Sequence, residues 1–172
     1  MAESADGGDT STSNQPAQPR RAEGSDYSGT NNQEQGVDEA DFVKTDGYNI
    51  YFLNGKNLVI FGVPEFGELT LLSTTPIQGS PTSMMLDGDR IVVISSVSSW
   101  TLGQNDPLVA ELGWDDAPGI WRSSSLTKFT VLDVSNRSAP TMEKELFLEG
   151  SYVTAREVKG TVRTVTHAWM NI

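Results

Sequence analysis

A dense acidic cluster near residue 40 is the first feature of this sequence that could do chemistry. Four carboxylates fall within nine residues, at Asp38, Glu39, Asp41 and Asp46. Because Ca²⁺ takes about six to eight hard oxygen ligands, these side chains could gather around that cation. Their spacing departs from the D-x-[DN]-x-[DN]-G pattern of a calcium loop. The alternatives are contact with a partner or a structural role, in which Asp46 caps a turn while the others bond backbone amides or face water.

Nucleophilic or acid-base catalysis finds little support in the residues. His167 is the single histidine, so a Ser-His-Asp triad would have to use it, and no G-x-S-x-G motif accompanies it. An S-x-x-K match at Ser125–Lys128 leads into a β-like run and lacks the partner motifs S-D-N and K-T-G. The absence of cysteine excludes disulfides, thiolate zinc sites and cysteine nucleophiles. We predict no catalytic residue, and no cofactor beyond the calcium considered above.

Tryptophan is concentrated in one segment of serine, glycine, proline and aspartate, Ser96–Ser125. Aromatic and acidic side chains there could bind a glycan by stacking and hydrogen bonding, or bind a basic peptide. These candidate partner-binding residues are Trp100, Trp114, Asp115, Asp116 and Trp121. The alternative is that the rings fold back to cover the edge of a neighbouring sheet.

Glycine turns that lead into strand-like runs recur along the chain, at Asp46–Leu53, Asp87–Ile94 and, weakened, Lys159–Thr166. Forty-one residues separate the first two turn glycines and 72 separate the second from the third. The excess of 31 residues nearly matches the 30 residues of Ser96–Ser125, which indicates an insertion, about 96–125, between two strands of one repeat. A repeat of about 40 residues built on alternating β-branched and aromatic side chains is typical of β-propeller blades.

The predicted fold class is all-β: a partial β-propeller of about two blades plus part of a third, with four-stranded antiparallel blades. The strands are predicted at Ile50–Leu53, Leu58–Val63, Leu69–Ile77, Ser83–Leu86, Arg90–Ser95, Lys128–Val134, Met142–Leu148 and Ser151–Val158. Closure of a propeller takes about four to eight blades. We therefore expect this chain to be a fragment that needs the remaining blades of its parent, and that folds poorly without them.

The amino-terminal residues differ in composition from the rest. Residues 1–35 are rich in small polar and charged side chains, and Met1 and Tyr27 are their only large non-polar ones. Such a segment cannot bury enough apolar surface to offset its ordering entropy, so we predict a disordered polar tail. Residues 36–172 are left for the incomplete propeller domain.

Charge and hydropathy limit the partners. The formal net charge is −11, and a strongly acidic surface repels phosphate backbones and anionic membranes, so no nucleic acid is expected. Cations, basic partners or high salt would suit it. No run approaches the ~18 apolar residues of a membrane span, so no membrane insertion by this segment is expected either.

Four motifs carry a family resemblance: G-V-D-E-A-D-F-V-K-T-D-G at Gly36–Gly47, L-D-G-D-R-I-V-V-I at Leu86–Ile94, V-L-D-V-S-N-R-S-A-P at Val131–Pro140, and L-E-G-S-Y at Leu148–Tyr152. Together they resemble the secreted bacterial and archaeal proteins with a C-terminal β-propeller domain, which is distantly similar to WD repeats. The resemblance implies a secreted or cell-envelope parent, a propeller that continues beyond this sequence, and an N-terminal export signal. The sequence itself shows no signal peptide, because no basic stretch followed by an apolar one begins at Met1.

Three functions are left open. The first is a non-enzymatic cell-surface module that binds a protein or glycan through inter-strand loops such as Ser96–Ser125. The second is a hydrolase or lyase whose catalytic residues lie mostly in the missing blades. The third is a calcium-stabilised structural module.

Overall fold

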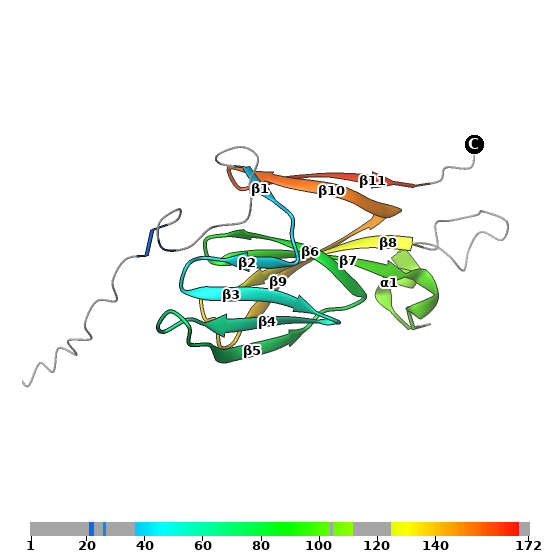
Figure 1. Cartoon of the computed structure of the whole chain (residues 1–172). Coiled ribbons are helices and arrows are strands. Elements are labelled where there is room, and N and C mark those ends of the chain that lie inside the picture. The colour runs from blue at the N-terminus through cyan, green and yellow to red at the C-terminus, as the bar shows by residue number, and fades with distance from the viewer. Residues whose placement is uncertain (1–20, 23–25, 27–36, 104, 112–124, 169–172) are drawn as a thin grey trace, which may run out of the picture.

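The computed structural model consists almost entirely of β-strands, which confirms the predicted all-β class (Figure 1). It describes residues 21–22, 26, 37–103, 105–111 and 125–168. Within them, eleven strands form three antiparallel sheets. Two of these sheets have four strands each, so the partial propeller with four-stranded blades is confirmed as well. The predicted disordered tail, residues 1–35, lies outside the described residues apart from 21–22 and 26.

The two four-stranded sheets, here called blade 1 and blade 2, are meanders in which each strand pairs with the next one along the chain. Blade 1 consists of β2 (Val43–Thr45), β3 (Asn49–Asn54), β4 (Asn57–Gly62) and β5 (Thr70–Pro76). Blade 2 consists of β6 (Ser80–Asp87), β7 (Arg90–Ser98), β8 (Ser125–Asp133) and β9 (Thr141–Glu149). This order places β5 and β9 at the open edges of their blades.

The third sheet joins a strand that precedes blade 1 to two strands that follow blade 2. It contains β1 (Val37–Glu39), β10 (Ser151–Val158) and β11 (Thr161–His167), with β10 in the middle. Figure 1 shows this sheet on one side of blade 2 and blade 1 on the other. Blade 2 is therefore the central layer of the described structure.

Two-residue turns join β3 to β4, β6 to β7 and β10 to β11, and each contains a glycine. The turn after β3 has Gly55 at φ 61°, and the turn after β6 has Gly88 at φ 56°. The turn after β10 uses Lys159 at φ 53° followed by Gly160 at φ 76°. A hairpin of two residues takes positive φ because that twist matches the twist of the strands it joins.

The sequence patterns missed two strands and set the insertion too wide. Strands β1 and β2 have three residues each, too few to show an alternating pattern, and pairing with other segments defines them. The segment between Ser98 and Ser125 joins β7 to its neighbour β8, and carries a 3₁₀ turn (Ser99–Thr101) and helix α1 (Pro107–Glu111). The strands extend to Ser98 and Ser125 because Val97 and its partner Leu126 are both buried. Among the described residues, no helix is long and apolar enough to cross a membrane.

Blade 2 is buried on both faces, and β6 shows how. Met84 lies in a core shared with blade 1, whereas Met85, the next residue, lies in a core shared with the third sheet. Successive side chains of a strand point to opposite faces, so one strand supplies both cores. The first core is completed by Tyr51, Leu53, Leu58, Ile60, Ile77, Ile91, Val93, Leu132 and Val134, and the second by Ile94, Phe129 and Ala155.

Blade 1 and the third sheet lack such a second cover among the described residues. Large apolar side chains are more than half exposed on β5 (Leu71), β10 (Val153) and β11 (Val165). Open sheet edges and apolar faces of this kind favour pairing with another sheet.

Two glycines immediately precede β6 and β10, and both face a carbonyl oxygen. Gly79 has φ 87°, and a Cβ built on it would lie 2.4 Å from the carbonyl oxygen of Ser96. Gly150 has φ 102°, and its Cβ would lie 2.5 Å from the carbonyl oxygen of His167. Gly79 and Gly150 are 71 residues apart, and so are Ser96 and His167. The same backbone contact is therefore repeated in blade 2 and in the third sheet.

Replacing Gly79 should therefore be costly. We expect Gly79→Ala to lower the free energy of unfolding by about 3 kcal/mol, since a left-handed backbone costs a side chain about 1–2 kcal/mol and overpacking adds about 1–3 kcal/mol. Urea unfolding followed by circular dichroism measures the loss. Gly88→Ala is the control, because its φ is also positive but no atom lies within 4 Å of the new Cβ. Equal losses in the two variants would contradict the close approach.

Candidate functional site

Asp46 closes the turn between β2 and β3, as one of the sequence alternatives proposed. Its Oδ1 accepts hydrogen bonds from the backbone amides of Tyr48 (2.9 Å) and Asn49 (2.6 Å). Its Oδ2 accepts hydrogen bonds from the Tyr51 hydroxyl (2.8 Å) and the Asn49 side-chain amide (3.0 Å). The carboxylate is thus surrounded by donors from its own blade.

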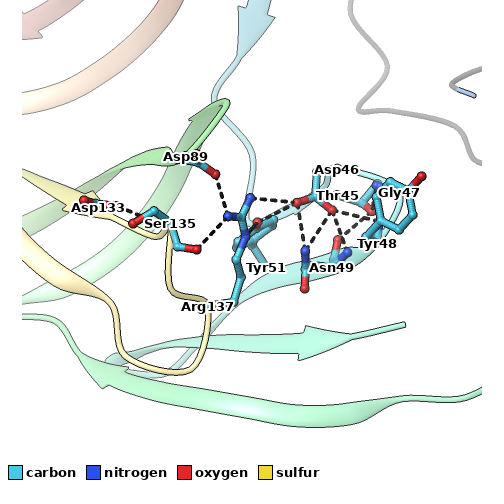
Figure 2. Close-up of polar contacts among 10 residues, drawn as sticks. All are labelled: Thr45, Asp46, Gly47, Tyr48, Asn49, Tyr51, Asp89, Asp133, Ser135 and Arg137. Atoms are coloured by element: carbon cyan, nitrogen blue, oxygen red, sulfur yellow. Dashed lines mark hydrogen bonds and ion pairs between the residues drawn. The ribbon is translucent and has the colours of Figure 1, made fainter. Parts of the chain in front are cut away.

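Arg137, in the loop between β8 and β9, brings blade 2 to this carboxylate (Figure 2). One terminal nitrogen lies 3.4 Å from Asp46 Oδ2, and Nε donates to the Tyr51 hydroxyl at 3.2 Å. The other terminal nitrogen donates to Asp89 Oδ1 at 2.5 Å and to the Ser135 carbonyl at 3.2 Å. Since Asp89 belongs to the β6–β7 turn of blade 2, one guanidinium joins acidic turns of two blades.

The electrostatics of this group fix its protonation states. Burial by itself would raise the pKa of Asp46, but the hydrogen bonds from Asn49, Tyr48 and Tyr51 outweigh it and lower that pKa. Burial and the charge of Asp46 raise the pKa of Tyr51. Burial opposes the charge of Arg137, but its bonds to Tyr51 and Asp89 raise its pKa. At neutral pH the group therefore holds an ionised carboxylate, a neutral phenol and a charged guanidinium, none poised to exchange a proton.

Two of the other three carboxylates of the acidic cluster, those of Asp38 and Glu39, bond groups on other strands. Asp38 Oδ1 lies 2.6 Å from the ammonium of Lys44, a side chain only 2% exposed, and Asp38 Oδ2 accepts the backbone N–H of Leu86 at 3.0 Å. Glu39 pairs with Arg156 of β10 at 3.1 Å. These contacts tie the segment before β2 to blade 2 and to the third sheet.

Asp41 forms a backbone bridge to β6. Its amide donates to the Met84 carbonyl at 3.0 Å, its carbonyl accepts from the Met84 amide at 2.7 Å, and its carboxylate accepts from the amide of Phe42 at 2.7 Å. In the described part of the chain, no three histidine, cysteine, aspartate or glutamate side chains gather as a metal site would require. The predicted calcium site therefore gains no geometric support there.

Two further sequence candidates lie in strands. His167 is the last residue of β11 and is exposed. The S-x-x-K match at Ser125–Lys128 forms the start of β8 rather than a helix. Its Lys128 is buried, donates to Gln78 Oε1 at 2.7 Å and pairs with Glu145. The ammonium thus has one partner on β9 and one in the connection between the two blades.

The tryptophan segment is described at its ends. Trp100 lies in the 3₁₀ turn that follows β7, and 86% of its surface is exposed. The other predicted partner-binding residues lie outside the described residues: Trp114, Asp115, Asp116 and Trp121.

The cations that pair with the acidic cluster were not predicted from the sequence. Arg137 was considered only within the motif Val131–Pro140, and Lys44 lies inside the acidic motif without a predicted role. The position of Lys44, a single lysine among four carboxylates, could have indicated that it pairs with one of them. No comparable local signal exists for Arg137, because 91 residues separate it from Asp46.

Comparison with known proteins gave two matches. A family model described as "Beta propeller domain" matches residues 27–172. An uncharacterised protein of Archaeoglobus fulgidus is 30% identical over 146 residues, which cover 84% of this chain and 20% of that protein. The chain therefore spans about a fifth of the length of this relative. No solved structure matches the chain.

Arg137→Ala should lower the free energy of unfolding by about 2–3 kcal/mol, because it leaves the half-buried Asp46 and the buried Tyr51 without their partner from blade 2. Arg137→Lys should recover less than half of the loss, since one ammonium cannot reach both acidic turns. Chemical denaturation provides the values. The control is Arg90→Ala, which removes an exposed 3.1 Å pair with Glu143 and should cost under about 1 kcal/mol. Similar losses for the two alanine variants would contradict a junction role.

Asp46→Asn should change how stability depends on pH. A carboxyl whose pKa is lowered by folding stabilises the fold above its unfolded pKa of about 4, and this contribution is lost as pH falls through the folded pKa. We expect the variant to be less stable by about 1–3 kcal/mol at pH 7 and the gap to narrow below pH of about 4. Thermal unfolding between these pH values measures it. Asp87→Asn, at the equivalent exposed position of blade 2, should leave no such gap; a gap independent of pH for Asp46→Asn would refute the assignment.

Proposed function

This chain belongs to the beta propeller domain family, and from that premise we propose that it is a non-enzymatic scaffold that binds a protein or a glycan. The contact surface lies on the segment between β7 and β8. A location outside the cytoplasm, which the sequence resemblance implied, is part of this proposal. The binding role is proposed for this chain and not for a longer parent protein, because the chain covers only 20% of its archaeal relative.

The exposed indole of Trp100 is the observation that supports this proposal. Strand β7 runs through the interior of blade 2 between β6 and β8, and Ile91, Val93 and Ile94 anchor it in both cores. Two residues after its last residue, Ser98, the chain presents a tryptophan that is 86% exposed. An aromatic side chain on a loop held by a rigid sheet is a common arrangement in recognition surfaces, where tryptophan contributes disproportionately to affinity.

The electrostatics favour binding over catalysis. A general acid near neutral pH needs a carboxyl whose pKa is raised, usually by burial without compensating donors. The hydrogen-bond donors around Asp46 lower its pKa, and hydrogen bonding from Ser135 lowers the pKa of the exposed Asp133. Among the described residues, these are the two carboxylates whose pKa clearly shifts, and both shifts favour the ionised form.

A binding experiment tests the role of Trp100. The chain is screened on a glycan array and, in parallel, used as bait for cell-envelope proteins, and the affinity of each hit is measured by titration calorimetry. We expect Trp100→Ala to weaken binding at least about tenfold, or about 1.4 kcal/mol, because the exposed ring supplies much of the contact. The melting temperature should stay unchanged, since the ring makes little contact with the fold.

Leu71→Ala is the matched control, because Leu71 is also exposed but lies on β5, away from the segment. Trp114→Ala is measured alongside, since the sequence predicts the same role for it. Binding by Trp100→Ala equal to that of the unmodified chain would contradict the proposed surface. Loss of binding accompanied by loss of the fold would contradict it too.

A further inference from the structure

The loop after β4 in blade 1 and the loop after β8 in blade 2 are structural copies of each other. Each begins with a valine whose amide donates to a turn carbonyl at 2.8 Å: Val63 to Tyr48, and Val134 to Asp89. Each loop then reaches a threonine that starts the outer strand of its blade, and both loops have the same length. Residues 71 apart therefore correspond.

The interior of the two loops agrees with this correspondence. In blade 1 the amide of Glu68 donates to the carbonyl of Glu65 at 3.0 Å, and in blade 2 the amide of Ala139 donates to the carbonyl of Asn136 at 3.0 Å. Both loops contain the same closed turn at the same place. The residue that follows the first turn residue is phenylalanine in blade 1 and arginine in blade 2.

Phe66 of blade 1 thus stands where blade 2 has Arg137, the residue that joins blade 2 to the acidic turn of the preceding blade. Blade 1 has no arginine of its own at this place in the loop. A different arginine lies there. The side chain of Arg21, from the segment before β1, packs its guanidinium over the Phe66 ring at 4.7 Å and over the Tyr48 ring at 5.0 Å.

Arg21 hydrogen-bonds the same loop and the same turn in blade 1 that Arg137 bonds in blade 2, and one of its guanidinium bonds is equivalent. One terminal nitrogen donates to the Pro64 carbonyl at 3.0 Å, and Pro64 corresponds to Ser135, whose carbonyl accepts from Arg137. The other donates to the Gly47 carbonyl at 2.7 Å. The backbone amide of Arg21 donates to the Tyr48 hydroxyl at 2.8 Å, and Tyr48 corresponds to Asp89.

We propose that Arg21 is the junction arginine of blade 1, supplied by the amino-terminal segment because the loop carries Phe66 instead. In blade 2 this guanidinium faces the acidic turn of the neighbouring blade at Asp46. By the same geometry, the surface that Arg21 builds fits the acidic turn of another four-stranded propeller sheet placed against blade 1. A cation presented by a chain of net charge −11 adds charge complementarity to the fit.

The third sheet of a second copy is a poor match for this surface. The residue that corresponds to Asp46 is Asp87 in blade 2 and Val158 in the third sheet, because Asp87 pairs with Arg90 across its turn as Val158 pairs with Thr161. Docking the third sheet against blade 1 would place the apolar Val158 at this position, where it offers no negative charge to Arg21. The fitting partner is thus a sheet with an aspartate or glutamate at this turn.

A double substitution tests whether Arg21 fills the place of a loop arginine. Phe66→Arg supplies that arginine directly, so it should displace Arg21 and raise amide hydrogen exchange at residues 21–22 at least about tenfold. Arg21→Ala alone should raise exchange similarly and lower the melting temperature. In a chain that already carries Phe66→Arg, adding Arg21→Ala should leave the melting temperature unchanged. Controls are Phe66→Leu, which removes the ring without supplying a guanidinium, and Arg20→Ala. Additive effects of the two main substitutions would overturn the equivalence.

An acidic substitution at Val158 tests the kind of partner. Val158→Asp gives the third sheet the acidic residue that blades 1 and 2 carry at this turn. Sedimentation velocity should then show head-to-tail association at least about tenfold stronger than that of the unmodified chain, and addition of Arg21→Ala should abolish the gain. Val153→Asp, also on β10, makes the same change elsewhere and should have no such effect. Unchanged sedimentation of Val158→Asp, or a gain that survives Arg21→Ala, would overturn the proposed partner.

Discussion

The buried ammonium of Lys44 determines how the three sheets meet. A charge that is 2% exposed needs close partners, because leaving it unpaired would cost several kcal/mol. Asp38 and the Glu39 carbonyl supply them, and the second oxygen of Asp38 reaches the backbone of β6. The neighbouring Glu39 side chain meets β10 through Arg156. A single short segment thereby makes polar contacts with all three sheets.

The repeat was predictable from the sequence because its signals are local. Glycine turns at positive φ and alternating apolar side chains recur with a fixed spacing, and the strands of blades 1 and 2 lie where these signals fall. Strands β1 and β2 gave no such signal, since both are short and become strands only through distant pairing. The extra residues at the ends of β7 and β8 were misassigned for a related reason: Val97 and Leu126 stand beside serine and threonine, which read as loop.

The acidic cluster shows the limit of reading a site from residue types. Four carboxylates in nine residues fit a cation, and the sequence does place them together. Their actual partners are a lysine within the cluster, Arg156 more than a hundred residues later, backbone amides, and Arg137 from the next blade. Spacing along the chain carries no information about partners that only the packing of blades brings near. Loop context was enough to single out Trp100, but it left open whether the ring is exposed or covers the edge of a sheet; in the structure the ring is exposed.

Blade 2 shares one core with each neighbour, and its two adjacent methionines divide between them. Both thioethers are almost fully shielded from solvent while the sheets stay packed. Peroxide converts an accessible thioether into a polar sulfoxide. Oxidation of Met84 would thus record a separation from blade 1, and oxidation of Met85 a separation from the third sheet. The pair forms a built-in chemical record of which face of the central blade has opened.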